Sequence, residues 1–120
     1  MAIVTIGADD ELATRAREFH DEMLDGYRYL VRTIRYTAKS FLHMLTMQGG
    51  VDTAKTLLRG TSTSDGFVRL WEENMLAHSV EASVIKPQYE LLFTDQERRT
   101  AQMRLQAHGF DVEGFLRSLN

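Results

Sequence analysis

The chain has 120 residues, of which 43% are hydrophobic, a net charge of −3 and no cysteine. This length and apolar content predict a single domain, residues 1–120, with one core. The lack of cysteine excludes disulfides, thiolate metal sites and thiol catalysis, and it favours a cytoplasmic protein. The apolar runs are too short to cross a bilayer and the N-terminus lacks a signal-peptide pattern, so neither membrane insertion nor secretion is expected.

Residues 1–8 are predicted to form an N-terminal arm. They contain the β-branched run Ile3–Ile6, which reads as a strand without an obvious mate, followed by Gly7. Two roles remain open for this arm: it packs on its own domain, or it docks on a partner.

The stretch Asp10–Arg35 is predicted to be one long helix around which the rest of the chain wraps. Its apolar side chains recur at spacings of three and four, which places them on one face: Leu12, Ala16, Phe19, Met23, Tyr27, Leu30, Val31 and Ile34. At 1.5 Å per residue the helix would be roughly 38 Å long. Acidic residues dominate its first two thirds and arginines its last third, as the helix dipole favours.

Glycine and hydroxyl residues divide the middle of the chain. Thr37 is expected to cap a second helix that runs through Met47 and ends at Gly49 and Gly50, and a short helix over 51–58 follows. Ser64 is the predicted cap of the next helix, residues 65–75. The inner face of that helix carries Trp71, which we expect to anchor the core.

The C-terminal third carries the clearest helix signals. Ser79 caps a short turn that Pro87 breaks, and Thr94 with Glu97 forms a capping box that opens a helix to about His108. Gly109 suits the left-handed C′ position, and Asp111 can cap a last helix. The predicted fold is therefore all-α: a compact single-domain bundle of five to seven helices around one long N-terminal helix.

The net charge conceals an alternation along the chain. Residues 1–27, 28–60, 61–97 and 98–120 carry net charges of −5, +5, −5 and +2. This pattern is typical of oppositely charged helices packed side by side with solvated faces, and a polar partner surface is the alternative.

Several short patterns follow one another along the chain: FLxML at 41–45, GGVDTAKTLL at 49–58, GFxxLW at 66–71, SVE at 79–81 and LFT at 92–94. Together they resemble an uncharacterised small all-helical module of bacterial proteins, over about residues 27–110. The resemblance implies a recurring helical fold. It implies no activity, cofactor or functional residue.

The chain contains carboxylates and histidines, but their spacing does not match that of a metal site or a catalytic site. The first helix has carboxylates at Glu11, Glu18, Glu22 and Asp25, which we predict to form a solvated acidic face because they lie away from the apolar stripe and lack Glu-x-x-His pairs. His20 lies on the apolar side, where it needs a hydrogen-bond partner. The remaining histidines, His43, His78 and His108, show no ligand spacing. No catalytic residue, cofactor or metal is predicted, which favours a non-enzymatic protein.

Two functions remain open at this stage. The first is a helical protein-interaction module, or a small subunit of a larger bacterial complex, that binds another protein or itself. The alternative is nucleic-acid binding through a loose helix-turn-helix over 51–75, against which the acids of its second helix argue. A better basic surface is the helix after Thr94, with Arg98, Arg99, Gln102, Arg104 and Gln106, or the middle block Arg28, Arg32, Arg35, Lys39, Lys55 and Arg59.

Overall fold

A computed structural model describes residues 8–120, and this part of the chain is entirely helices, turns and loops. The elements are α1 (Ala8–Ile34), α2 (Lys39–Arg59), α3 (Asp65–Glu72), the 3₁₀ turn η1 (Leu76–His78), α4 (Val80–Val84), the 3₁₀ turn η2 (Pro87–Leu92), α5 (Asp95–Ala107) and α6 (Val112–Ser118). The predicted all-α bundle around a long first helix is confirmed. The predicted arm falls outside the described residues except for Ala8, which begins α1.

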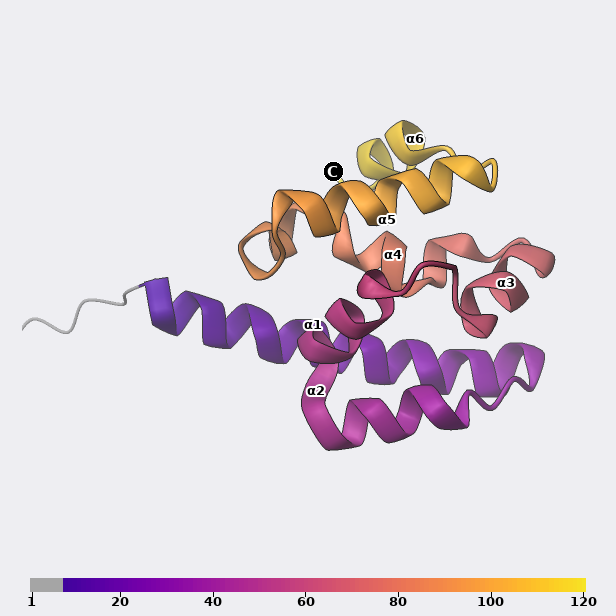
Figure 1. Cartoon of the computed structure of the whole chain (residues 1–120), viewed down its shortest axis with the longest axis horizontal. Coiled ribbons are helices and arrows are strands. Elements are labelled where there is room, and N and C mark those ends of the chain that lie inside the picture. Colours follow the sequence, from indigo (N-terminus) through magenta and orange to yellow (C-terminus); the bar gives the residue numbers. More distant parts are fainter. Residues whose placement is uncertain (1–7) are drawn as a thin grey trace, which may run out of the picture.

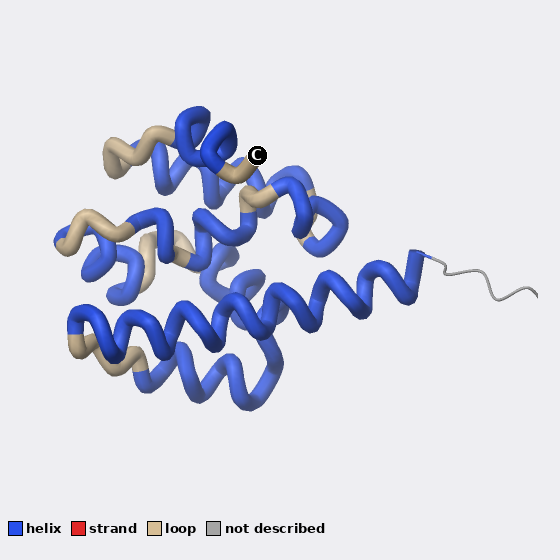
Figure 2. The backbone as a smooth tube through the Cα atoms, turned by 180° about the vertical axis from the view of Figure 1, so that it is seen from behind, coloured by secondary structure: helices blue, strands red, loops and turns tan. Residues whose placement is uncertain are grey.

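The helices form two layers. The first part of α2 runs antiparallel to α1 in one layer, and the part after Gly49 crosses toward the other layer, which α4, α5 and α6 form, with α3 at one end (Figure 1). The view from behind shows that the N-terminal part of α1 extends beyond the rest of the bundle (Figure 2). α1 therefore sets the longest dimension of the described part of the chain. No helix within residues 8–120 is both long enough and apolar enough to span a membrane.

The apolar stripe of α1 supplies the centre of the core. Phe19, Met23 and Leu30 are buried, as the spacing predicts. The ring of Phe19 is completely buried and meets two rings edge to face, those of Tyr89 and Phe93, each at a centroid distance of 5.1 Å. These contacts hold the two layers together through residues about 70 positions apart in the chain.

α2 bends where the sequence predicts a break. Gly49 has φ +84° and ψ 171°, which interrupts the helix, and Gly50 resumes it against α1. A Cβ at Gly50 would lie 2.6 Å from the Cα of His20, so only glycine allows this close approach. The Gly50 N–H donates to His20 Nδ1 at 3.0 Å. A backbone amide at a helix start thus provides the partner that His20 was predicted to need.

The predicted cap of α2 is wrong by one residue. Ala38 occupies the N-cap, and its side chain has no oxygen to accept a hydrogen bond. The chain turns sharply between α1 and α2, with Arg35 at φ +54° and the Lys39 N–H donating to the Thr37 carbonyl. Thr37 belongs to this tight turn, and α2 begins two residues later, at Lys39.

α3 is shorter than predicted, and Trp71 lies outside the core. The helix is capped by Ser64 as expected, but it ends at Glu72 because Asn74 adopts φ +58° and the Met75 N–H donates to the Leu70 carbonyl. This is a Schellman termination with asparagine at C′. The predicted anchoring of the core by Trp71 is wrong: its side chain is 49% exposed, and its ring meets His108 edge to face.

The predicted C-terminal caps are confirmed. Ser79 accepts from the Ala82 N–H, Asp111 accepts from the Gly114 N–H, and both bonds of the Thr94–Glu97 capping box form. Gly109 has φ +79°, and the Phe110 N–H donates to the Leu105 carbonyl at 3.0 Å in a Schellman motif. Local signals therefore position the starts of α4, α5 and α6 and the end of α5.

Thr94→Ala is expected to lower the free energy of unfolding by about 1 kcal/mol, because the Glu97 N–H loses its acceptor. Urea denaturation of the variant and the wild type measures this loss. Thr61→Ala, in the exposed loop after α2, is the matched control and should change stability little. Equal stability losses in both variants would contradict the role of the capping box.

Candidate functional site

A cavity of about 700 Å³ opens between the two layers, at the end where α3 lies in Figure 1. We call it the α1–α4 cavity, because it lies among the C-terminal half of α1, the start of α2, α3 and the segment from η1 to α4. Its apolar lining comes mostly from large side chains: Met23, Tyr27, Tyr29, Leu30, Tyr36, Phe41, Met44, Leu57, Phe67 and Leu70. Its size and lining are typical of a ligand-binding or partner-binding cavity.

Gly26 keeps one wall of this cavity open. It lies in the interior of α1, lines the cavity, and a Cβ built on it meets nothing within 4 Å. Glycine in a helix interior costs about 1 kcal/mol relative to alanine. Neither backbone strain nor crowding requires glycine at position 26. The effect of the missing side chain is to leave the cavity open beside α1.

Gly26→Ala is therefore expected to raise the free energy of unfolding by up to about 1 kcal/mol. Gly50→Ala is the matched control, because the same added methyl group would lie 2.6 Å from the His20 Cα and should destabilise the protein. Urea denaturation distinguishes the two. A loss of stability in Gly26→Ala would mean that the space beside Gly26 is not open.

A polar cluster centred on Glu22 lines the cavity beside α4. The Glu22 carboxylate accepts hydrogen bonds from Ser83 Oγ, from Lys86 Nζ at 3.0 Å and from the Tyr89 hydroxyl at 2.9 Å. Burial alone would raise the pKa of Glu22, but the bonds from Ser83 and Lys86 and the Lys86 charge outweigh it and hold that pKa below its usual value. Burial and the Glu22 contact raise the pKa of Tyr89 to about 12.

This cluster corrects the predicted solvated acidic face of the first helix. Glu11, Glu18 and Asp25 are exposed as expected, but Glu22 turns toward the protein. The reason is tertiary: α4 and η2 pack across α1 and present donors to this one turn. The helical periodicity alone places Glu22 beside its solvated neighbours.

His78 forms the opposite edge of the polar lining. Its ring stacks on Tyr29, with a centroid distance of 4.6 Å and an interplanar angle of 26°. Partial desolvation and the positive charge of Lys86 lower the pKa of His78, which favours the neutral imidazole at pH 7. It therefore offers the cavity an aromatic face and a neutral polar edge.

Glu81 is the most buried charged residue of the lining, only 2% exposed. Burial raises its pKa, against the lowering effect of Arg104, whose Nη1 lies 3.4 Å from Glu81 Oε2. The same guanidinium donates to the carbonyls of Leu57, Leu58 and Gly60. Arg104 thus closes the C-terminal end of α2 and pairs with Glu81 from behind the cavity wall.

The five residues of the alternative nucleic-acid surface are not brought to one face. Arg104 points inward, and Arg98 is half-buried, with Nη2 3.5 Å from the Ile85 carbonyl and Nη1 3.9 Å from Glu90 Oε1. Arg99, Gln102 and Gln106 are exposed. A hollow of about 170 Å³ lies beside Arg98, Arg99 and Gln102 and includes the acidic Asp95.

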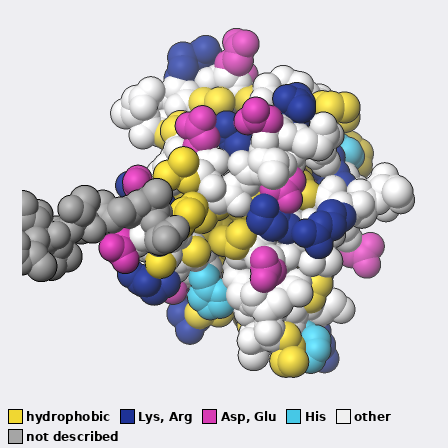
Figure 3. All heavy atoms as spheres, turned by 60° about the vertical axis from the view of Figure 1, so that its left-hand side comes forward, with side chains coloured by type: hydrophobic (Ala, Val, Ile, Leu, Met, Phe, Trp, Pro, Cys, Tyr) yellow, Lys and Arg dark blue, Asp and Glu magenta, His cyan; other side chains and the backbone are white. Residues whose placement is uncertain are grey.

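Two residues of the basic middle block have acidic partners. Lys55 pairs with Glu97 at 2.7 Å, and Arg28 lies 3.8 Å from Asp25. Figure 3 shows positive and negative side chains interspersed, with apolar ones between them, on the face where α1 extends from the bundle. Within residues 8–120, no group of three or more His, Asp or Glu side chains is placed to hold a metal ion.

Comparison with known proteins adds no functional assignment. No family model, curated protein or solved structure matches the chain. The resemblance to a helical bacterial module therefore stays a prediction, and function rests on the α1–α4 cavity.

Sequence reasoning did not identify this cavity, because its walls come from four separated segments. Gly26 was the one signal available, as a glycine inside an otherwise strongly predicted helix.

Proposed function

We propose that this chain is a non-enzymatic helical protein-interaction module of the cytoplasm, a small subunit whose α1–α4 cavity receives an apolar segment of another protein. One observation carries the proposal: an open cavity of about 700 Å³ has walls made of aromatic and aliphatic side chains. Partner proteins anchor themselves by inserting such side chains into preformed pockets.

The chemistry of the lining supports binding rather than catalysis. The carboxylate of Glu22 is engaged by three donors, and Glu81 is engaged by Arg104, so the polar groups of the lining hold the walls in place. The absence of cysteine throughout the chain supports a reducing compartment.

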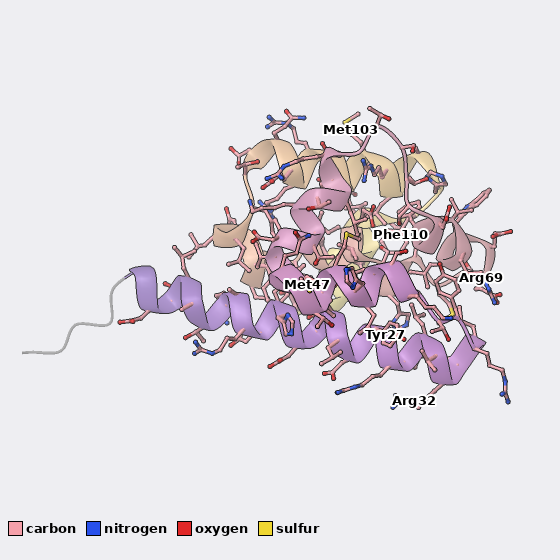
Figure 4. All side chains as sticks on the ribbon, turned by 60° about the horizontal axis from the view of Figure 1, so that its bottom comes forward. Tyr27, Arg32, Met47, Arg69, Met103 and Phe110 are labelled. Atoms are coloured by element: carbon pink, nitrogen blue, oxygen red, sulfur yellow. The ribbon has the colours of Figure 1, made fainter. Side chains whose placement is uncertain are left out.

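Photo-crosslinking tests the proposal. A benzophenone amino acid replaces Tyr27, which lines the cavity, or Met103, which is exposed on α5 and lies well away from Tyr27 in Figure 4. Ultraviolet irradiation of cells that express each variant should give a discrete adduct with another protein from position 27 and none of that mass from position 103.

Gly26→Leu, which adds a large side chain to the cavity wall, should abolish the adduct, and Gly26→Ala should keep most of it. Circular dichroism establishes that both variants are folded. An adduct that survives Gly26→Leu, or that forms equally from position 103, would show that the cavity is not the contact surface.

Duplex DNA is expected to bind no better than about 10⁻⁴ to 10⁻⁶ M at about 0.15 M salt, the range of non-specific association. The inward position of Arg104 and the acidic partners of Arg98 and Lys55 are the reasons. Fluorescence anisotropy with a random duplex measures the affinity. Sub-micromolar binding that is lost in Arg98→Glu/Arg99→Glu would favour the nucleic-acid alternative instead.

A further inference from the structure

The α1–α4 cavity and the apolar start of the chain belong to opposite ends of α1. The uncharged run at residues 3–6, Ile-Val-Thr-Ile, precedes α1, which begins at Ala8. The part of α1 that lines the cavity is residues 22–30, in its C-terminal half. The N-terminal part of α1 extends beyond the bundle (Figure 2), so Ala8 lies far from the cavity of its own chain.

Segment 3–6 cannot reach the centre of this cavity in its own chain. Gly26, at the open wall, lies about 27 Å from Ala8 along the helix axis, because α1 rises 1.5 Å per residue. Ile3 is five residues from Ala8, and five residues span at most about 18 Å in any conformation. The cavity of a second copy is not subject to this limit.

The lining suits an uncharged, apolar occupant. Its deep charged groups are engaged within the protein, Glu22 with Lys86 at 3.0 Å and Glu81 with Arg104 at 3.4 Å. The remaining walls are aromatic and aliphatic, and they favour side chains whose burial removes apolar surface from water. Segment 3–6 supplies three such side chains within four residues, and β-branching already restricts their rotamers, so little side-chain entropy is lost on burial.

The charges along α1 are complementary to those of a second copy. Glu11, Glu18, Asp25 and Arg32 follow one another at seven-residue spacing, which places them on one face of the helix, and all four are exposed. The two in the middle pair with arginines of their own helix, at 2.9 and 3.8 Å. The two at the ends, Glu11 and Arg32, have no ion-pair partner among residues 8–120.

An antiparallel pair of α1 helices about a two-fold axis brings these features together. It sets Glu11 of each copy against Arg32 of the other, and it sets Ala8 of each copy against Arg35 of the other, at the end of α1. Gly26 of that other copy is then about 14 Å away along the axis, nine residues from Arg35, which is within the reach of segment 3–6.

We propose that the occupant of the α1–α4 cavity is segment 3–6 of a second copy, exchanged reciprocally between the two chains of a dimer. Such an interface is self-complementary, so it closes at two copies. This inference rests on the proposed function and names the partner.

Crosslinking tests the exchange, since the chain has no cysteine of its own. Tagged chains carrying Thr5→Cys are mixed with untagged chains carrying Gly26→Cys or Met103→Cys and treated with a short bismaleimide. A covalent heterodimer should form with Gly26→Cys and far less with Met103→Cys, which is exposed on α5 in the other layer. Equal yields would overturn the proposal. So would a link within one chain in Thr5→Cys/Gly26→Cys.

Sedimentation equilibrium measures the dissociation constant of the dimer. Ile3→Asp/Ile6→Asp should raise it by about tenfold or more, because charged groups would enter apolar walls. Met47→Asp/Met103→Asp is the matched control, with the same charges on two exposed apolar positions, and should change it by less than about twofold. A wild type that is monomeric at every concentration tested, or equal effects of the two variants, would contradict the exchange.

A charge swap tests the antiparallel pairing. Glu11→Arg should raise the dissociation constant by about fivefold, since two exposed ion pairs per dimer are lost. Adding Arg32→Glu in the same chain restores opposite charges and should bring the constant back to within about twofold of the wild type. Further weakening in the double variant would show that these two residues do not face each other.

The photo-crosslink at position 27 separates this inference from the proposed function. An adduct with the mass of two copies, lost in Ile3→Asp/Ile6→Asp, supports both. An adduct of any other mass shows that the second copy is not the occupant, and the proposed function stands. If position 27 gives no adduct, both proposals fail.

Discussion

Replacing Arg104 by methionine is expected to lower the free energy of unfolding by about 3 to 5 kcal/mol, the usual cost of removing one partner of a buried ion pair. Glu81 would remain 2% exposed without its cation, and the carbonyls of Leu57, Leu58 and Gly60 would lose a shared donor. Urea denaturation at pH 7 measures the loss.

The dependence of this loss on pH identifies its cause. Because burial raises the pKa of Glu81, the folded state holds that proton to higher pH than the unfolded state does. The stabilising contribution of the protonated carboxyl is complete below its unfolded pKa and is lost as pH rises through the folded pKa. The Arg104→Met loss should therefore be smaller at pH 5 than at pH 7.

Two further variants complete this test. In Arg104→Met/Glu81→Gln the buried charge is gone, so part of the stability should return, and the pH dependence should disappear. If Arg104→Met loses as much stability at pH 5 as at pH 7, the lost carbonyl contacts rather than the Glu81 charge are responsible.

Phe19→Ala is the second large effect, with an expected loss of about 3 to 5 kcal/mol. The ring is completely buried and its edge contacts with Tyr89 and Phe93 join the two layers, so its removal leaves a void that rigid helices on both sides keep open. Thermal and urea denaturation measure the loss.

Trp71→Ala is the control for side-chain size. Tryptophan is the larger residue, yet it is 49% exposed on the short helix α3, so its removal should cost clearly less than the removal of Phe19. A larger loss for Trp71→Ala than for Phe19→Ala would reverse the assignment of the core.

Local signals predicted most of the helix boundaries. The caps at Thr94, with Glu97, and at Ser64 form hydrogen bonds to backbone groups only a few residues away, and Gly109 ends its own helix. Their geometry therefore depends little on the rest of the fold. The same holds for the break at Gly49.

Features that depend on distant segments were missed or misjudged. Glu22 turns inward because donors from α4 and η2 lie across from it, and Trp71 stays half-exposed beside the ring of His108, outside the core. The α1–α4 cavity requires four segments at once, and helical periodicity contains no information on how they meet. The glycine at position 26 is compatible with such a cavity but does not predict it alone.

The contact between α1 and η2 also affects how the protein folds. Tyr89 bonds to Glu22 across 67 positions of the chain, whereas α1 and α2 are joined by a short turn. Closing a long loop costs entropy before any contact is gained, so we expect the α1–α2 hairpin to form early and η2 to close on Phe19 late. Stopped-flow measurements should then show that Phe19→Ala mainly accelerates unfolding. The ring that joins the two layers would determine how long the folded protein lasts, more than how quickly it forms.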